Sequence, residues 1–296
     1  MSLRMLLLLV LGVPLLVLGG AAVMGQRIAL PEWGRGYVLR FALDAPGTPL
    51  ELPQVAGPDD PARPLVVIDA GHGGRDPGAI GEDEAGKRIA EKDITLAIAR
   101  ALRDELLKTG TIRVALTRED DRILALADRP EIARQLGADL FISIHADSAG
   151  ESNTVSGASV YTLSTEASSE AAERFAAREN NADKVNGLVV AGQSEVVSTI
   201  LVELAQARTQ DDAARFAGLL LREGEGTLAF VAQPRRAAAL AVLRAPDVPS
   251  VLFESGFVTN EADRARLTTP EGRQAYAAVL ARAIRIYFAR RAGEEG

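Results

Sequence analysis

From Leu65 onward the chain alternates between short apolar runs and stretches in which apolar residues recur at helical spacing. The runs predict buried strands and the amphipathic stretches predict helices. Strands are predicted at residues 65–72, 112–116, 139–144, 158–163, 240–243 and 250–253, and helices after Glu91 and at 130–136 and 270–290. This order predicts an α/β fold with a single, mostly parallel twisted sheet flanked by helices.

Residues 164–236 break this rhythm. Helical spacing predicts three helices there, at 167–180, 194–206 and 209–223, with loops between them and no strand. An all-helical block inside a strand-rich domain predicts an insertion. We therefore expect a catalytic domain over residues 64–291 that carries this helical insertion, followed by a short tail at 292–296.

The first 25 residues resemble an export signal. Arg4 precedes an uncharged apolar run from Met5 to Leu18, and Gly20-Ala21-Ala22 supplies small residues for cleavage. The alternative is an uncleaved anchor, because the apolar stretch continues loosely to Met24, near the lower limit for a membrane span. Either interpretation predicts an exported, periplasmic or extracytoplasmic protein, with no membrane span in the mature chain if the leader is cleaved.

Residues 26–63 form a proline-rich segment, with one candidate strand at 37–43. Such a segment is too short to bury much core of its own.

Composition removes several classes of function. The net charge is −7 and no basic cluster is present, which argues against a nucleic-acid partner. Cysteine is absent, so disulfides and thiolate metal ligands are excluded. Any metal site must use imidazole and carboxylate ligands.

Both histidines of the chain, His72 and His145, end predicted strands. Sites in open α/β sheets form beyond the carboxyl ends of the strands, so the two imidazoles are expected at one edge. Two imidazoles at one edge favour a metal site. The alternative is two unrelated histidines, each hydrogen-bonded near the core.

The loop after the first strand is rich in glycine, over residues 71–78. Such loops often bind phosphate, but the Walker spacing with its Lys-Ser/Thr is missing and G-x-G-x-x-G does not match. The glycines more plausibly let the backbone pass close to a metal or a substrate.

Two carboxylates complete the predicted site. Glu91 stands where the helix after this loop should begin, at the same edge as His72, although a simple first-turn glutamate is the alternative. The acidic residues 82–84 compete with it but fall in a glycine-bounded loop. Glu254 ends the apolar run 251–253, where an ionisable residue is rare without a partner or a task, so it is a candidate general base or acid.

Two imidazoles and one carboxylate suit zinc and leave a fourth position open for water, while a second carboxylate takes that water's proton. Affinity alone does not exclude another divalent ion.

Four motifs together resemble the exported, cell-division type of zinc-dependent N-acetylmuramoyl-L-alanine amidase. They are Ile-Asp-Ala-Gly-His-Gly-Gly at His72, Glu-Lys-Asp at Glu91, Ser-Ile-His-Ala-Asp at His145 and Phe-Glu-Ser-Gly-Phe-Val-Thr-Asn at Glu254. The resemblance implies one zinc ion held by His72, Glu91 and His145, with Glu254 as the catalytic carboxylate.

The implied substrate is peptidoglycan, cut between the lactyl group of N-acetylmuramic acid and L-alanine. Ala70 departs from the family, which often has proline there. The segment 26–63 is also too short for the β-rich targeting domain that relatives often carry. Arg118 and Arg129, in the family's connecting segment, are interpreted as structural.

The helical block also resembles the insertion of regulated family members, in which a helix covers the zinc. Glu195, Thr199 and Glu203 fall on one helical face. We predict that Glu195, ahead of Glu203, is an inhibitory fourth metal ligand in an autoinhibited state; an exposed acidic stripe is the alternative. The resemblance implies a separate protein activator of the degenerate LytM type.

Two rival functions remain open on the sequence. A zinc carboxypeptidase acting on stem peptides would use the same ligands, but no arginine is clearly placed to clamp a terminal carboxylate. A non-catalytic wall-binding scaffold would be expected to lose a ligand or Glu254, and all four residues are present.

Overall fold

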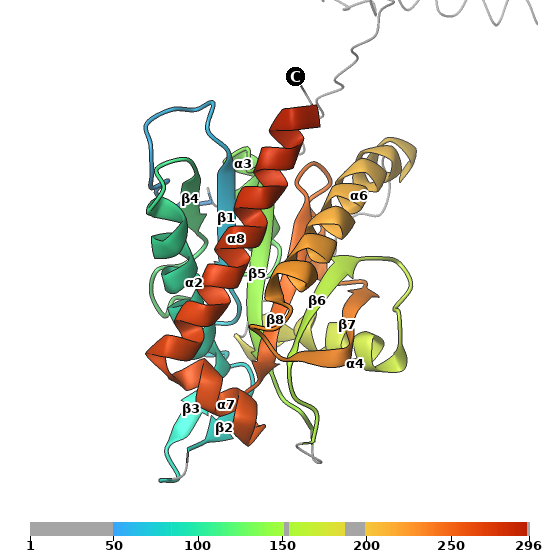
Figure 1. The fold of residues 1–296 in the computed structure, drawn as a ribbon. Helices are drawn as coiled ribbons and strands as arrows, with labels where there is room; N and C mark the ends of the chain where they lie inside the picture. The colour runs from blue at the N-terminus through green and yellow to red at the C-terminus, as the bar shows by residue number, and fades with distance from the viewer. Residues whose placement is uncertain (1–49, 84, 151–153, 187–198, 295–296) are drawn as a thin grey trace, which may run out of the picture. The chain divides into compact units, whose positions relative to one another are not determined.

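The computed structural model describes residues 50–83, 85–150, 154–186 and 199–294. Their main feature is a six-stranded sheet in the order β4-β1-β5-β8-β6-β7 (Figure 1). The strands are β1 (Leu65–Ala70), β4 (Arg113–Leu116), β5 (Leu140–Asp147), β6 (Ala158–Leu163), β7 (Phe230–Ala238) and β8 (Ser250–Phe257). A separate hairpin joins β2 (Ile80–Glu82) to β3 (Arg88–Ala90).

The sheet is mostly parallel, as the sequence predicts. β1 pairs in parallel with β4 and β5, and β5 pairs in parallel with β8. β6 runs antiparallel to β8, and β7 is parallel to β6. The carboxyl ends of β1, β5 and β8 therefore share one edge of the sheet.

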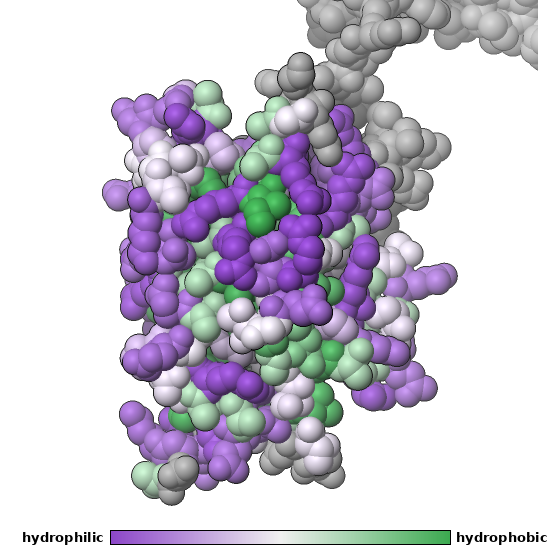
Figure 2. Space-filling model, viewed as in Figure 1, coloured by the Kyte–Doolittle hydropathy of each residue, from purple (hydrophilic) through white to green (hydrophobic). Residues whose placement is uncertain are grey.

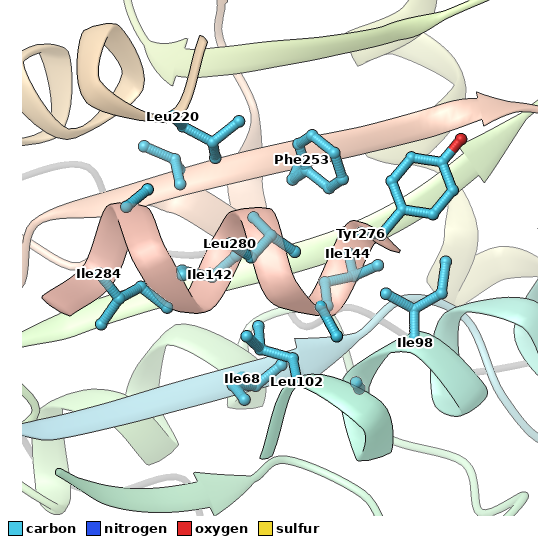
Figure 3. Close-up of a cluster of buried hydrophobic side chains, with 14 of the residues drawn as sticks. Ile68, Ile98, Leu102, Ile142, Ile144, Leu220, Phe253, Tyr276, Leu280 and Ile284 are labelled. Carbon is cyan, nitrogen blue, oxygen red and sulfur yellow. The ribbon is translucent and has the colours of Figure 1, made fainter. Parts of the chain in front are cut away.

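Helices α2 (Glu91–Leu107), α6 (Thr199–Gly224) and α8 (Pro270–Glu294) cover one face of the sheet, and α7 (Glu261–Thr268) precedes α8 (Figure 1). Figure 3 shows side chains of these helices meeting those of β1, β5 and β8 in a buried core. The outer side of the helices is largely hydrophilic (Figure 2).

The opposite face of the sheet is covered by smaller elements. These are α3 (Asp128–Gln135), α4 (Glu170–Glu179) and a 3-10 helix (Ala241–Leu243), which pack together in a second core cluster. The short helix α5 (Ala182–Val185) follows α4. The second face therefore carries a thinner layer than the first.

The predicted all-helical block at 164–236 is wrong in two respects. β7 begins inside it at Phe230 and is the last strand of the sheet. Proline is tolerated there, because an edge strand pairs on one side only and Pro234 needs no N–H for a second neighbouring strand. The mixed, polar sequence of β7 lacks the alternation by which strands are recognised. In addition, one continuous helix, α6, extends over residues 199–224, where two helices were expected.

The second half of α6 belongs to the main core. Ala213, Phe216, Ala217 and Leu220 are buried in the cluster that α8 and the sheet share. Burying each large apolar side chain stabilises a fold by about 1.5–3 kcal/mol. This part of the block is therefore integral to the domain and not an addition to it.

Two smaller predictions also differ from the structure. Residues 240–243 were expected to form a strand, but Ala241–Leu243 form a 3-10 helix whose Val242 and Leu243 are buried in the second core cluster. Glu82 was expected in a loop but lies on β2. Short apolar runs do not distinguish a strand from a buried helical turn.

The amino-terminal segment is described only from Leu50. Ala56 forms an antiparallel bridge to Val114 on β4, with both N–H···O bonds at 2.8 Å. The chain from Leu50 onward belongs to the same compact unit as the sheet. The predicted leader at 1–25 and the candidate strand at 37–43 lie outside the described residues, within which no helix is long and apolar enough to cross a membrane.

Candidate metal centre and active site

Three adjacent parallel strands deliver the predicted site residues to one edge of the sheet. His72 follows β1 by two residues, His145 lies on β5, and Glu254 lies on β8. His145 and Glu254 are direct partners in the β5–β8 register. All three side chains are buried. The topology thus brings together residues that are far apart in the chain.

His72 is held in an uncommon backbone conformation. Its φ is +62°, and within the described residues it alone among non-glycine residues has a positive φ. Histidine tolerates this region better than most residues, but the cost is still of order 1–3 kcal/mol. Asp76 Oδ2 accepts a 2.8 Å hydrogen bond from Nδ1 of the ring. That bond leaves Nε2 directed toward Glu91.

Glu91 reaches the same point from the first turn of α2. It lies on the buried face of that helix together with Ile94, Thr95 and Ile98, so packing of α2 turns its side chain inward. The N–H groups of Ala79 and Ala146 each donate a 2.8 Å bond to its carboxylate. Burial would raise the pKa of Glu91, but the neighbouring His72 and His145 hold it well below its usual value.

The two imidazoles converge on one carboxylate oxygen. His72 Nε2 and His145 Nδ1 each lie 3.1 Å from Glu91 Oε1, and the ring centroids are 4.8 Å apart. Burial would lower the pKa of His72, but the charge of Glu91 and the hydrogen bond to Asp76 raise it well above its usual value. A cation would compete with that proton for the Nε2 lone pair.

Two glycines make this convergence possible. A Cβ atom at Gly71 would lie 2.5 Å from His145 Nε2, and one at Gly78 would lie 2.6 Å from Glu91 Oε2. Neither position can hold a side chain while the histidine and the glutamate keep their places. The glycine-rich loop thus lets the backbone approach the site closely, as the sequence predicts.

Two of the three separations in this donor set match those around a tetrahedral ion. Donor atoms bound at about 2.0–2.1 Å from a tetrahedral zinc lie roughly 3.3 Å from one another. The separations from Glu91 Oε1 to the two imidazole nitrogens are both 3.1 Å. Within the described part of the chain, the buried Nε2 of His72 makes no hydrogen bond. These residues therefore fit a zinc ion in spacing and in chemistry.

Glu254 lies beside this group with one oxygen unoccupied. Its Oε1 accepts a 2.6 Å hydrogen bond from Asp147 N, whereas its buried Oε2 has no hydrogen-bond partner among the residues that the structure describes. Burial, followed by the charges of Asp147 and Glu91, raises the pKa of Glu254 well above its usual value. A carboxylate of this kind accepts a proton readily and can hold it.

Sequence reasoning missed one carboxylate at the site, Glu179 at the end of α4. Its Oε2 lies 3.5 Å from His72 Nε2 and 3.3 Å from His145 Nδ1, and the three donor atoms lie within 4.8 Å of one another. Glu179 continues the buried stripe of Ala172, Phe175 and Ala176. A charged residue at the next position of an apolar stripe was the signal in the sequence that could have identified it.

The segment from α4 through α5 lies over the site, and we call residues 170–186 the cover. Phe175 stacks on Tyr161 of β6, with ring centroids 4.5 Å apart. Arg178 forms an ion pair with Asp147, whose pKa burial raises to about 7 although Arg178 opposes the shift. A pocket of about 370 Å³ remains between the cover and the site, lined on the body side by His72, Glu91 and Asp147 among others.

Arg118 and Arg129 are buried and hold the loop that carries His72. Arg129 pairs with Asp69 at 2.9 Å and donates to the carbonyls of Ala70 and His72. Arg118 donates to the carbonyls of Ala70 and Gly71. Both arginines therefore act as structural supports, and the element that they support bears a site residue.

The remaining predicted ligand, Glu195, lies outside the described residues. Its prediction as an inhibitory ligand therefore stays a prediction.

Known proteins resemble this chain over most of its length. The family described as N-acetylmuramoyl-L-alanine amidase matches residues 66–285. The chain is similar to the amidase AmiA of Escherichia coli, with 38% identity over 226 residues that cover 76% of each protein. It is also similar to AmiC of Escherichia coli, with 36% identity over 238 residues, or 80% of this chain and 55% of the relative. The chain thus spans about half the length of one of these relatives and three quarters of the other.

Solved structures give the same result. The amidase AmiC2 of Nostoc punctiforme is similar at 28% identity and a TM-score of 0.53, covering 76% of this chain and 97% of that one. The matched region contains all four residues that the sequence predicts at the site edge. The chain belongs to the N-acetylmuramoyl-L-alanine amidase family.

Proposed function

We propose that the protein hydrolyses the amide bond between the lactyl group of N-acetylmuramic acid and L-alanine in peptidoglycan. One observation carries the proposal: His72 and His145 each direct a ring nitrogen to within 3.1 Å of the same Glu91 oxygen. A second carboxylate, Glu254, lies beside this group, and its Oε2 has no hydrogen-bond partner within the described part of the chain. Family membership supplies the substrate class.

His72, Glu91 and His145 would hold one zinc ion. When bound, zinc polarises a carbonyl, lowers the pKa of a water toward about 7 and stabilises a developing oxyanion. The hydrogen bond from His72 to Asp76 and the N–H donors on Glu91 orient two of the three donor groups. Such supporting bonds fix the orientation and basicity of ligating groups.

Glu254 supplies the proton transfers. Its Oε2 takes a proton from the attacking water and returns it to the leaving nitrogen of alanine. Asp147 N–H holds the other oxygen, Oε1, at 2.6 Å, so the carboxylate has a defined orientation. Because its pKa is raised, Glu254 can hold that proton until it is transferred to the nitrogen of the leaving alanine. The products are glycan strands with free lactyl carboxyls and released stem peptides.

The cover keeps the resting enzyme inactive. Glu179 Oε2 lies near the same two imidazole nitrogens as Glu91 Oε1, where its carboxylate would help to hold the metal and exclude both water and substrate. The distances of 3.3 and 3.5 Å from the imidazole nitrogens support this role. Displacing the cover needs an activator, for which the family resemblance suggests a degenerate LytM protein. The apolar leader supports export to the compartment that contains peptidoglycan.

The reaction is tested on purified peptidoglycan with zinc-loaded protein carrying Glu179→Ala. Mass spectrometry should detect free lactyl ends and intact stem peptides. Release of single terminal amino acids would support a carboxypeptidase instead. Absence of any product, with zinc content and folding intact and a known amidase active on the same substrate, would indicate a binding protein. Glu254→Gln in the same background serves as the inactive control.

A further inference from the structure

Polar side chains of the cover pair with backbone groups beside the site. Nδ2 of Asn180 donates a 2.9 Å bond to the carbonyl of Ala239, and Ala241 N–H donates a 2.8 Å bond to Oδ1 of Asn180. One side-chain amide thus satisfies both a donor and an acceptor of the body. This is the pairing that a peptide or acetamido group would make.

A second pairing of the same kind lies on the loop before α3. The N–H of Leu126 donates a 2.8 Å bond to Oδ1 of Asp183 on α5. In the part of the chain that the structure describes, the hydrogen bonds of Leu126 N–H, Ala241 N–H and Ala239 C=O all go to the cover. When the cover leaves, these three groups therefore lose their partners together.

These loops border the histidine pair. One cavity is lined by His72, His145 and the cover residues Asn180 and Asp183, and its body side is completed by Leu124, Leu126 and Val242. The last three supply the apolar part of its lining. A ligand carrying amides separated by small apolar groups matches this arrangement in both respects. A lactyl-alanyl peptide has that composition.

We propose that Ala239 C=O, Ala241 N–H and Leu126 N–H are the amide-binding groups for the substrate, and that the cover occupies them as a substrate mimic. The inference rests on the proposed function for the identity of the substrate, a glycan-linked peptide. The cover then has a second effect besides blocking the metal: its side chains occupy the three backbone groups to which the substrate would hydrogen-bond. On activation, these three backbone groups exchange the side chains of the cover for the amides of the substrate.

Proline substitution removes a single N–H and suits both positions. Ala241 is the first residue of the 3-10 helix, where proline is tolerated, and Leu240 before it has an extended ψ of 121°, as a residue preceding proline requires. Leu126 is the second residue of a turn closed by the Asp128 N–H to Ala125 carbonyl bond, where proline is favoured. Both variants should fold.

The test separates the substrate from the cover. In a Glu179→Ala, Asn180→Ala background the cover has lost both its carboxylate at the histidines and its bond to Ala241. Adding Ala241→Pro can then act only through the substrate. We expect KM for a soluble glycan-linked peptide to rise about 5- to 10-fold, the value of one hydrogen bond. Ala241→Gly, which keeps the N–H, is the matched control, and KM of the proline variant should exceed that of the glycine variant by this factor.

The second site is tested in the same way. Leu126→Pro is compared with Leu126→Ala, which loses the side chain but keeps the N–H, both in a Glu179→Ala, Asp183→Ala background. We expect KM of the proline variant to exceed that of the alanine variant by about the same 5- to 10-fold factor, because both lack the side chain and only the proline variant lacks the N–H. Should one proline variant fail to fold by melting temperature, the other still decides.

Equal KM values in the folded proline variants and their controls would overturn the inference. The proposed function is checked separately, because the background variants must themselves release lactyl ends from peptidoglycan. If they release none with zinc bound, the proposed function has failed. If they do and KM does not respond, only the amide-binding assignment has failed.

Discussion

The carboxylate of Glu179 lies 3.3 Å from Nδ1 of His145, although one residue ends a helix of the cover and the other lies in the central sheet. A buried charge is costly unless it is paired. Apart from Arg178 of the cover itself, 3.6 Å away, the partners of Glu179 among the described residues are the two histidines, so the position of the cover and the state of the site are linked. The first prediction tests this link.

Replacing Glu179 by alanine should increase hydrolysis of peptidoglycan in the absence of any activator. Hydrogen bonds to charged groups contribute about 1.5–3 kcal/mol, which corresponds to roughly a 10- to 100-fold rise in the uncovered population. Dye release from labelled peptidoglycan measures the change. Glu173→Ala, at an exposed position of the same helix, is the control. A basal rate that stays at the wild-type value would remove Glu179 from the resting-state proposal.

Replacing Glu254 by glutamine should abolish turnover without loss of zinc. Proton transfer by a positioned carboxylate typically contributes 10²- to 10⁴-fold, and glutamine keeps the shape of the side chain. The comparison is made in the Glu179→Ala background, with zinc measured by atomic absorption. Activity above about a tenth of the parent value would exclude Glu254 as the base. A loss of zinc would reassign it as a ligand.

The same substitution should stabilise the metal-free protein at neutral pH. The pKa of Glu254 is raised well above its ordinary value of 4.5, chiefly by burial. A carboxyl whose pKa is higher in the folded chain destabilises the fold once it ionises. The penalty is absent below the unfolded pKa, grows as the pH rises from the unfolded toward the folded pKa, and is complete above it.

Melting temperatures of metal-free wild type and Glu254→Gln should therefore agree near pH 4 and diverge toward pH 8, with the variant higher. Glu223→Gln is a suitable comparison, because the paired arginines lower the pKa of Glu223 and its substitution should have the opposite sign. A wild type that is more stable than Glu254→Gln at pH 8 would contradict the burial argument.

Replacing Arg129 by lysine should weaken zinc binding about 10-fold, the low end for groups that support metal ligands. Arg129 is buried, pairs with Asp69 and donates to the carbonyl of His72, whose backbone is strained. Lysine keeps the charge but not the planar set of donors. Competition with a chromogenic chelator measures the dissociation constant.

Arg134→Lys, at a solvent-accessible ion pair on the same helix, is the control for Arg129. We expect it to bind zinc like the wild type. If the two variants bind zinc equally, Arg129 supports the fold alone and not the ligand.

Much of the site could be predicted from the chain. His72, His145 and Glu254 each end an apolar run, and a parallel sheet brings such ends to one edge. Glu91 could be located because a helix after a strand begins at that same edge. The structure brings these four side chains together, while their roles as ligands and base stay predictions.

The cover could not be predicted in the same way. The only sign of Glu179 in the sequence is one charged residue in the apolar stripe of its helix. The acidic face containing Glu195 and Glu203 was a better match to helical periodicity. Periodicity identifies which residues share a face but not what that face meets. β7 was not predicted for a related reason. It is an edge strand that pairs on one side only, and such a strand needs no continuous apolar run.

The sequence by itself determined the alternation of strands and helices and the four residues at the sheet edge, because local patterns of burial encode both. Only the tertiary structure decided that Glu179 meets the histidines and that Asn180 and Asp183 pair with backbone groups of Ala239, Ala241 and Leu126. These contacts join segments that pack across the face of the sheet. Which groups meet depends on how the helices of the cover pack against the sheet and its loops, and a local sequence pattern does not contain that information.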